Sequence, residues 1–388
     1  MEWVEKKSSE LYVSSSGLSK SSDQFGYGYP FLAYKDVFNN YYAPDKLSTL
    51  VNSTEKDRMK CSVKQGDVFL TRTSETTDEL GMSCVALHDY VNATFNGFTK
   101  RLRPLTDEIE PKYAAYYFRS PYFRSQCISL ASLITRASLN DGMIRRLKIR
   151  YPLNRKVQEK IGEILYTYDT LIENNTKRIR LLEKMAENLY KEWFVRFRFP
   201  GHENVEMENG LPKGWKYVNF SNLSPILTGK KDANYASQNG KYKFFTCSKN
   251  DLVADNYSFD CFAIILAGNG DLNVKLYDGQ FEAYQRTYVL SPYDVEHIYV
   301  SYYTIQSELD RLLVGAAGAV IKFLTKGMIE KIKVLLPTND VLVRFNSIQE
   351  HNYRLRQNLK RQNSLLARQR DLLLPRLMSD KLEVKVKA

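Results

Sequence analysis

The sequence predicts an α+β protein in which two globular α/β segments alternate with two long helices. Three observations lead to this prediction. The segment Asp141–Pro152 shares glycine, methionine, isoleucine, lysine and proline with Lys326–Pro337, at an offset of 185 residues. Each copy is followed by about 40 residues with apolar side chains at heptad spacing, a pattern typical of long helices that pair. Each half also opens near a tryptophan, Trp3 or Trp215. The sequence therefore predicts an internal pseudo-two-fold repeat.

The boundaries between the segments follow from changes in composition. Tyr, Phe, Val and Thr with frequent turn residues indicate strand-rich globular segments, with internal helices expected near 111–124 and 302–313. Both repeated Gly-Met-Ile segments are expected to be short strands that end at the proline. We predict a first globular segment over 1–152, a first long helix over 153–198, a linker over 199–210, a second globular segment over 211–337, a second long helix over 338–380 and a charged tail over 381–388.

Each long helix carries two stripes of residues seven positions apart. In the first helix the stripes contain Leu165, Ile172, Ile179, Ala186 and Trp193, and Ile161, Tyr168, Asn175, Leu182 and Leu189. In the second they contain Phe345, Asn352, Leu359, Leu366 and Leu373, and Ile348, Leu355, Gln362 and Gln369. We expect the two helices to form a coiled coil with each other, in which Asn175 fixes the register. The alternative is that each helix packs on its own globular segment or on a different partner.

Composition limits the function classes. The net charge of +12 favours an acidic partner such as nucleic acid or a membrane surface, although a basic surface without a special partner stays open. No apolar run of 18 residues exists, so we expect no membrane span, and the opening residues contain no apolar targeting segment. Five cysteines without a CxxC pair and four scattered histidines predict reduced thiols, a cytoplasmic location and no metal site.

Motifs for catalysis are missing from the sequence. It contains no phosphate-binding GxxxxGK[ST] loop and no Asn-Pro-Pro-aromatic motif of the kind found in amino-methylating enzymes. Glu383-Val384-Lys385 resembles the end of a nuclease motif but has no acidic partner at a suitable spacing. We therefore expect a binding protein without a catalytic site of its own.

Candidate DNA contacts follow the central strand of each globular segment. In the first segment, the strand at 66–70 leads into a loop with hydroxyls, an arginine and a carboxylate, groups that bind phosphates and base edges. The first set of candidates is Thr71, Arg72, Thr73, Ser74, Glu75, Lys100, Arg101 and Arg136, with further cations at Arg103, Arg119 and Arg124. In the second segment, the strand at 261–266 leads into 267–271, and the candidates are Lys230, Lys231, Gly268, Asn269, Asn273, Lys275 and Arg286. The alternative is that these are ordinary polar loops over ordinary strands.

Several short motifs in this order resemble the specificity subunit of type I restriction–modification systems. They are Gly-Asp-Val-Phe-Leu-Thr-Arg-Thr at 66–73, Leu-Tyr-Lys-Glu-Trp-Phe at 189–194, Leu-Pro-Lys-Gly-Trp at 211–215, Ile-Leu-Ala-Gly-Asn-Gly-Asp-Leu-Asn-Val-Lys at 265–275 and Arg-Asp-Leu-Leu-Leu-Pro-Arg-Leu-Met-Ser at 370–379. Each motif is short, but together with the duplication they extend the resemblance over nearly the whole chain.

The resemblance implies a fold and a role. Each globular segment would be a target recognition domain for half of a split site in double-stranded DNA, and the helices would be an antiparallel coiled-coil spacer that docks two modification subunits. Those subunits would bind S-adenosylmethionine and methylate adenine at N6. Restriction and translocase subunits would supply ATP- and Mg-dependent chemistry, so this chain would bind no cofactor itself. Two alternatives remain, an unusual DNA-modifying or DNA-cleaving enzyme and a coiled-coil protein that binds DNA without sequence preference.

Overall fold

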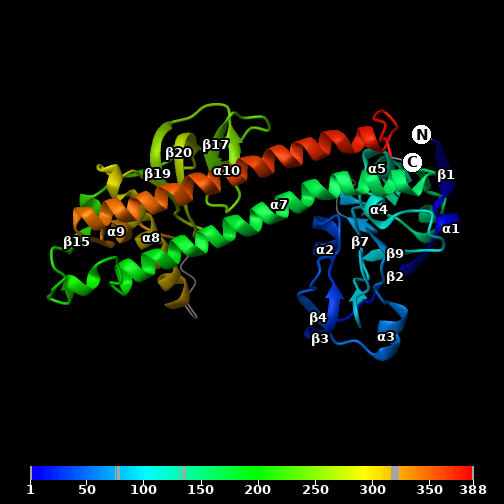
Figure 1. Ribbon diagram of the computed structural model, residues 1–388, viewed down its shortest axis with the longest axis horizontal. Coiled ribbons are helices and arrows are strands. Elements are labelled where there is room, and N and C mark those ends of the chain that lie inside the picture. Colours follow the sequence, from blue (N-terminus) through cyan, green and yellow to red (C-terminus); the bar gives the residue numbers. More distant parts are fainter. Residues whose placement is uncertain are drawn as a thin grey trace. The chain divides into compact units, whose positions relative to one another are not determined.

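The computed structural model divides into two compact units (Figure 1). It describes residues 2–74, 76, 79–130, 132–133, 137–315 and 323–386. Unit 1 comprises Met1–Thr176 and Lys360–Ala388, and unit 2 comprises Lys177–Leu359. Two long helices, α7 (Arg155–Tyr190) and α10 (Asn339–Leu377), each contribute one part to each unit. The fold is therefore mixed helix and sheet, but the compact units are not contiguous segments, because the C-terminal end of the chain packs with the N-terminal half.

Unit 1 is built on small sheets that are mostly antiparallel. The four-stranded sheet has the order β2 (Tyr12–Ser16), β9 (Thr99–Pro104), β5 (Val68–Thr71) and β7 (Ser83–Val85). A three-stranded sheet has the order β4 (Thr49–Val51), β3 (Phe25–Leu32) and β8 (Thr94–Phe95). The remaining strands are β1 (Trp3–Lys7) with β12 (Lys148–Pro152), and β10 (Ser132–Leu133), β11 (Ala137–Ser138) and β6 (Thr73–Ser74).

Short helices cover these sheets, and each begins where the sequence supplies a cap. They are α1 (Ser8–Leu11), the 3-10 turn η1 (Ser22–Gln24), α2 (Tyr34–Asn39), α3 (Glu55–Lys60), α4 (Pro111–Tyr117), α5 (Pro121–Leu130) and α6 (Asp141–Arg146). Helix α3 starts with a capping box in which Thr54 and Asp57 accept each other's backbone N–H groups. The helix expected near 111–124 is two helices, because the chain turns at Phe118–Ser120 and restarts with Pro121 at the first helical position.

The main core of unit 1 joins residues from both ends of the chain. The tyrosines of α4 are buried beside Ile161 and Leu165 of α7, and Leu374 and Leu377 of α10 belong to the same cluster. The segment expected to be a free charged tail also takes part, since Val384 and Val386 pack against this core. A second cluster, which contains Phe69 of β5 and Phe95 of β8, fills the space between the two larger sheets.

Unit 2 contains a single six-stranded sheet. Its order is β16 (Ile226–Thr228), β21 (Thr287–Leu290), β19 (Phe259–Ala267), β20 (Val274–Ala283), β17 (Tyr242–Phe245) and β18 (Leu252–Ala254). Because side chains alternate along a strand, β19 supplies both faces: Ile264 and Leu266 join the large core with the helices, whereas Ala263 and Ile265 join the smaller cluster around Phe281.

Helices and two small ladders complete unit 2. The ladders are β13 (Met207–Glu208) with β14 (Leu211–Pro212), and β15 (Lys216–Asn219) with β22 (Lys333–Leu336). The helical elements are α8 (Ile298–Gly315), α9 (Lys326–Glu330), the π-helical turn η3 (Lys191–Val195) and the 3-10 turns η4 (His202–Asn204), η5 (Phe220–Asn222), η6 (Ala233–Tyr235) and η7 (Val295–His297).

The repeated Gly-Met-Ile segment forms the same local motif in each unit. In unit 1 it is helix α6, capped by the Asn140 side chain, and it leads into β12, which pairs with the tryptophan-bearing β1. In unit 2 it is helix α9, capped by the Thr325 side chain, and it leads into β22, which pairs with β15 directly after Trp215. The expectation of a strand throughout was wrong for the first part of each copy. There the side chain of Asn140 or Thr325 accepts a hydrogen bond from a backbone N–H group of the first helical turn, which stabilises a short helix.

The buried stripe of α10 is displaced by one residue from part of the predicted seam. Phe345 and Leu359 are buried as expected, but Ile348 is 46% exposed and its neighbour Gln349 is 1% exposed. The stripe therefore continues through the buried Gln349 and Arg356 and the half-buried Asn363 and Arg370. Of the predicted stripe, Leu355 is half-buried and Ile348, Gln362 and Gln369 are exposed. An apolar-only pattern search misses this stripe because most of its members are polar.

Polar side chains of α10 bind the backbone of α7 in both units. In unit 2, Gln349 Nε2 donates to the carbonyl of Ala186 at 3.3 Å, and Asn352 Nδ2 donates to that of Leu182 at 3.1 Å. In unit 1, Asn363 Nδ2 donates to the carbonyl of Ile172 at 3.3 Å. These bonds satisfy polar groups that would otherwise be buried without partners.

The residues expected in the seam of α7 differ in how deeply they are buried. Leu165, Asn175 and Ile179 are buried, and Ile172, Leu182 and Leu189 are half-buried. Asn175 Nδ2 lies 3.5 Å from Gln362 Oε1 within unit 1. On α10, Leu355 and Leu366 are half-buried.

Candidate nucleic-acid interface

The loop after β5 is the first candidate site. Thr71 is fully buried and its hydroxyl donates to the carbonyl of Glu79 at 2.9 Å, so it holds the loop and faces away from solvent. Ser74 is also buried and donates to Glu79 Oε2 at 2.8 Å. Arg72 and Thr73 are half-buried, and the Arg72 Nε group is buried without a partner in the described part of the chain. Of this set, Arg72 and Thr73 remain the side chains that reach the surface; Glu75 lies outside the described residues.

Lys100 and Arg101, also predicted for the first site, point into the protein. Lys100 and Arg101 are adjacent on β9 and therefore face opposite sides of the sheet. Lys100 Nζ contacts Asp141 at 2.9 Å and Ser16 Oγ at 2.8 Å, and its side chain is 5% exposed. Arg101 Nη1 donates to the carbonyl of Ser62 at 2.6 Å and is 7% exposed. The sequence could not show this burial, and both side chains stabilise unit 1 in this conformation.

Arg103 and Arg119 are likewise engaged in internal contacts. Arg103 forms an ion pair with the buried Asp67 at 2.6 Å, and hydrogen bonding to Asp67 raises the pKa of the guanidinium. Arg119 donates to four backbone carbonyls, those of Ser83, Val37, Phe38 and Asn40. Arg124 is half-buried, and its Nη1 donates to Met82 Sδ at 2.7 Å. Arg136, the last cation of this set, lies outside the described residues.

In unit 2 the predicted residues converge on one part of the curved sheet. The backbone N–H of Gly268 donates to the carbonyl of Arg286 at 2.9 Å, which joins the loops after β19 and before β21. Gly268 is buried, and a Cβ there would lie 2.5 Å from the Arg286 carbonyl oxygen, so only glycine permits this approach. Asn273 Nδ2 donates to the carbonyl of Cys247 at 3.0 Å. Asn269 is half-buried beside this junction.

Three cations of the second set lie on the same surface. Lys230 and Arg286 are exposed. Lys231 is half-buried with its ammonium 4.5 Å from the centroid of the Tyr235 ring, and its carbonyl accepts from the N–H of Gln285 at 2.9 Å. The structure thus brings together the predicted loops of unit 2, whereas in unit 1 Lys100 and Arg101 are buried and Arg103 and Arg119 are held by internal contacts.

A charged and aromatic group adjoins this surface, and of its members the sequence indicated only Lys275. Asp251 accepts from Lys243 and Lys275, each at 2.7 Å. Burial works against ionisation of Asp251, but the hydrogen bonds from the two ammonium groups outweigh it and lower its pKa. Both ammonium groups also lie within 6 Å of the Phe245 ring, at 5.8 and 5.5 Å from its centroid. No motif marks this group because its members come from three separate strands and loops.

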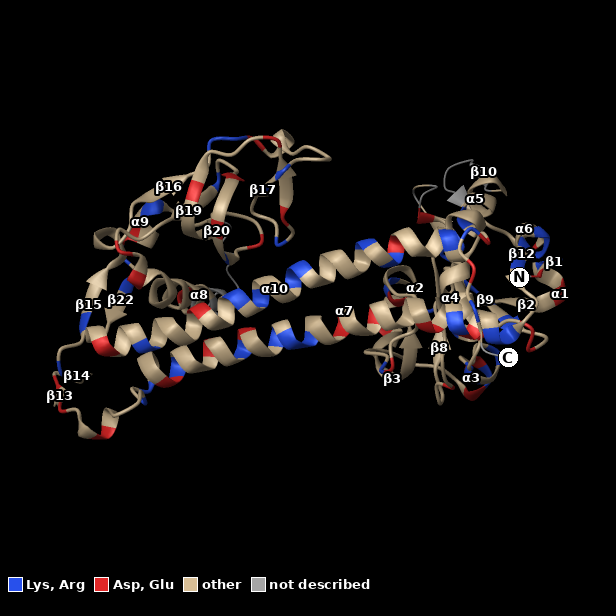
Figure 2. Ribbon diagram, turned by 45° about the horizontal axis from the view of Figure 1, so that its top comes forward, with Lys and Arg blue, Asp and Glu red and all other residues tan. Residues whose placement is uncertain are grey.

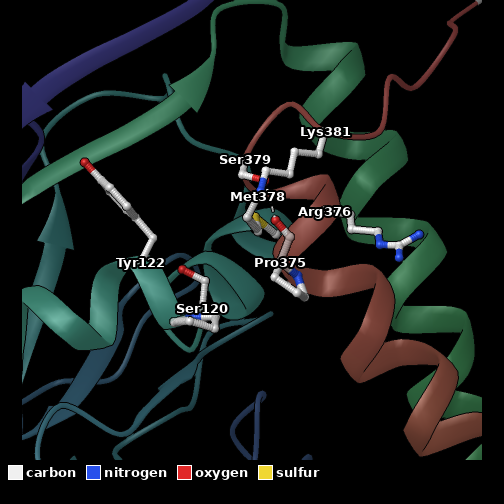
Figure 3. Close-up of a pocket in the computed structure, with 8 residues that line it drawn as sticks. Ser120, Tyr122, Pro375, Arg376, Met378, Ser379 and Lys381 are labelled. Carbon is white, nitrogen blue, oxygen red and sulfur yellow. Dashed lines mark hydrogen bonds between the residues drawn. The ribbon is translucent and has the colours of Figure 1, made fainter.

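One hollow among the described residues of unit 1 contains serines, which need a neighbouring general base to act in catalysis. Figure 3 shows this hollow, where Ser120 and Tyr122 of the α4–α5 region lie near Pro375, Met378 and Ser379 at the end of α10. No histidine, cysteine or carboxylate lines this hollow, so its serines have no general base among the residues that line it.

The described part of the chain lacks two features, a cluster of metal ligands and a membrane-spanning helix. Within it, no group of three or more His, Cys, Asp or Glu residues could hold a metal ion. No helix among the described residues is both long and apolar enough to cross a membrane.

Charge is distributed unevenly along the long helices (Figure 2). The α10 sequence from His351 to Arg370 contains six arginines and lysines and no acidic residue. The first part of α7 is more acidic and includes Glu159, Glu163 and Asp169.

Comparison with known proteins gives a consistent class. Residues 2–184 match the family model of the type I restriction modification DNA specificity domain. The EcoDI specificity subunit of Escherichia coli is 38% identical over 128 residues, which are 33% of this chain and 29% of that protein. The MjaIX specificity subunit of Methanocaldococcus jannaschii is 24% identical over 414 residues, covering 99% of this chain and 94% of that protein.

A solved structure shows the same fold. The crystal structure of the type I restriction–modification S subunit from M. genitalium has a TM-score of 0.60 and 15% identity, covering 97% of this chain and 96% of that one. The fold is therefore that of a solved type I restriction–modification S subunit. Residues 2–184 match the type I DNA specificity domain, and the chain is similar over nearly its whole length to a type I specificity subunit.

Proposed function

We propose that the globular part of each unit reads one half of a bipartite target in double-stranded DNA. The observation that carries this proposal is the repeated motif: α6, β12 and β1 in unit 1 match α9, β22 and β15 in unit 2, whereas the candidate reading loops differ. The loop after β5 presents Arg72 and Thr73, and the loops of unit 2 present Lys230, Asn269 and Arg286. A shared scaffold with different loop side chains suits the reading of two different base sequences.

The two long helices form the spacer of this proposal, as an antiparallel coiled coil. Within unit 1, Asp169 pairs with Arg370 and Ile172 with Asn363; within unit 2, Leu182 pairs with Asn352. The residue numbers rise along α7 while they fall along α10, which supports an antiparallel pair. A helix of 36 residues at about 1.5 Å per residue is roughly 54 Å long, enough to span one turn of duplex, about 34 Å.

Partner subunits would supply the chemistry. We propose that two modification subunits dock on the helices and methylate adenine at N6 with S-adenosylmethionine, and that restriction and translocase subunits use ATP and Mg. Apolar side chains on the outer faces of the helices support a docking role, because water-exposed leucines and methionines gain from being covered. They are Leu171, Leu181 and Met185 on α7, and Ile348, Leu365 and Leu372 on α10.

Purified chain is expected to bind duplex DNA with an affinity that falls steeply with salt. The logarithm of the binding constant should decrease with the logarithm of salt concentration by about 0.9 for each neutralised phosphate. Arg72→Ala should weaken binding by about tenfold when the target is intact, and should alter the preference for one half-site only. Fluorescence anisotropy titrations over a range of salt concentrations measure both effects.

The controls separate this function from the alternatives. Lys213→Ala removes an exposed lysine that pairs with Glu206, and it should leave both half-sites unchanged. Equal effects of Arg72→Ala on the two half-sites would refute the assignment of Arg72 to one of them. Methyl transfer or cleavage by the purified chain alone would establish an enzyme, and equal affinity for all duplexes would establish a non-specific binder.

A further inference from the structure

Strand β3 contains an extruded loop that no requirement of the fold explains. Phe25 and Tyr29 both pair with Val51 of β4, so the three residues between them, Gly26, Tyr27 and Gly28, project out of the ladder. Phe25 packs edge-on against Phe31 at 5.3 Å between ring centroids, which anchors the base of the loop. The extrusion is therefore a defined feature between two fixed points, as bulges in strands generally are.

Both glycines of the loop adopt a backbone conformation that other residues rarely take. Gly26 and Gly28 each have φ of +95°. A Cβ on Gly28 would lie 2.6 Å from the carbonyl oxygen of Val51, whereas a Cβ on Gly26 would meet nothing within 4 Å. Space alone would thus permit a side chain at Gly26, and only its conformation demands glycine.

The residue that this loop presents is an exposed tyrosine. Tyr27 is 50% exposed, and its side chain makes no hydrogen bond, ring contact or cation contact with the described part of the chain. The two glycines lose more conformational entropy on folding than other residues would, and the half-exposed Tyr27 ring adds little packing to the unit in return. Its amphipathic ring suits a contact with another molecule.

Cations beside the loop indicate the kind of molecule. The guanidinium carbon of Arg58 lies 3.8 Å from the centroid of the Tyr29 ring, and Arg58 Nη1 donates to the carbonyl of Ser53 at 2.5 Å. Arg58 belongs to α3, which also carries the exposed Lys56 and Lys60. The charge of Asp57 on the same helix is partly neutralised by Lys20 at 3.1 Å. Figure 1 shows β3, β4 and α3 together at the end of unit 1 that lies away from α7.

We infer that the Gly26–Tyr27–Gly28 loop is a DNA-reading element of unit 1, in which Tyr27 enters a groove of the half-site and Arg58 contacts the adjoining backbone phosphates. This inference rests on the proposed function and adds a specificity-determining residue to it. The occupant is duplex DNA because an exposed aromatic side chain flanked by arginine and lysine combines base contact with phosphate contact. Tyr27 would complement Arg72 of the loop after β5.

The test uses the full chain with its modification subunits. Methylated adenines mapped in cells that express the wild-type complex define the target, and a duplex with that target is then the binding probe. Tyr27→Ala should weaken binding about tenfold and relax base choice in one half-site. Its salt dependence should stay that of the wild type, because the ring neutralises no phosphate. Tyr27→Phe should retain most of the affinity, and Gly26→Ala should resemble Tyr27→Ala because it forces the loop out of its conformation.

Control variants separate a loss of DNA reading by Tyr27 from misfolding and from failure of the proposed function. Tyr293→Ala removes a tyrosine of unit 2 that is 74% exposed and should leave the mapped motif unchanged. Thermal unfolding of each variant identifies one that fails to fold. Wild-type affinity and an unchanged motif for Tyr27→Ala would overturn the inference. A Tyr27→Ala chain that no longer binds the modification subunits but still binds DNA as the wild type does would also overturn it. If the wild-type complex itself showed no bipartite motif, the proposed function would fail and not this inference alone.

Discussion

Phe345→Ala is expected to lower the free energy of unfolding of unit 2 by about 3–5 kcal/mol. Phe345 is fully buried, and its ring lies 5.7 Å from Trp193, 4.8 Å from Phe194 and 6.3 Å from Tyr303 between centroids. These contacts join α10 to the end of α7 and to α8. Removal of the ring leaves a cavity among rigid aromatic side chains that cannot collapse to fill it. Chemical denaturation of the full chain, followed by tryptophan fluorescence, measures the loss.

Ile348→Ala is the matched control for this substitution. The heptad pattern placed Ile348 in the seam of the second helix, but the side chain is 46% exposed. Its truncation should therefore cost less than about 1 kcal/mol. Equal losses for Phe345→Ala and Ile348→Ala would contradict the buried stripe described for α10.

Arg119→Ala should destabilise unit 1 by about 3 kcal/mol, because it removes a charged donor from several carbonyls at once. Arg119 Nε donates to the carbonyl of Ser83 at 2.6 Å. Its Nη2 group lies 2.8, 2.7 and 2.9 Å from the carbonyl oxygens of Val37, Phe38 and Asn40, at the C-terminal end of α2. Hydrogen–deuterium exchange should show faster exchange in α2 and β7.

Two variants separate this structural role from DNA binding. Arg119→Lys should recover only part of the stability, because an ammonium group cannot span four acceptors as a guanidinium does. Arg145→Ala removes an exposed arginine from α6 and should change stability by less than about 0.5 kcal/mol. Unchanged exchange in Arg119→Ala, together with weaker DNA binding, would show that Arg119 acts as the sequence first suggested.

The long helices could be predicted because their pattern is local. Heptad spacing over dozens of residues located α7 and its buried positions, since Leu165, Ile179 and Trp193 all lie in the cores. The second stripe of α10 could not be found in this way. Gln349 and Asn363 are stabilised by hydrogen bonds to α7, and such partners are not visible in the sequence of one helix.

The sequence could predict those residues of the candidate site that lie in loops at the ends of strands. The sequence placed candidate residues in the loops after β16 and β19 and before β21, but it did not predict that these loops lie near each other, which follows from the antiparallel pairing of β21 with both strands. Charge alone was misleading for Lys100 and Arg101, because a basic side chain in a strand can itself be buried against a carboxylate or backbone carbonyls of the same unit. The loop around Tyr27 carries no charge and was overlooked, although its Gly-Tyr-Gly sequence was a visible signal.

The most direct test of the account is the map of methylated adenines in cells that express this chain together with a type I modification subunit. The central claim is that the two units read separate half-sites. The account predicts a bipartite motif with two unrelated halves and a spacer of constant length, and a change in only one half when Arg72 is replaced. Methylation at a single uninterrupted motif, or simultaneous changes in both halves, would contradict it.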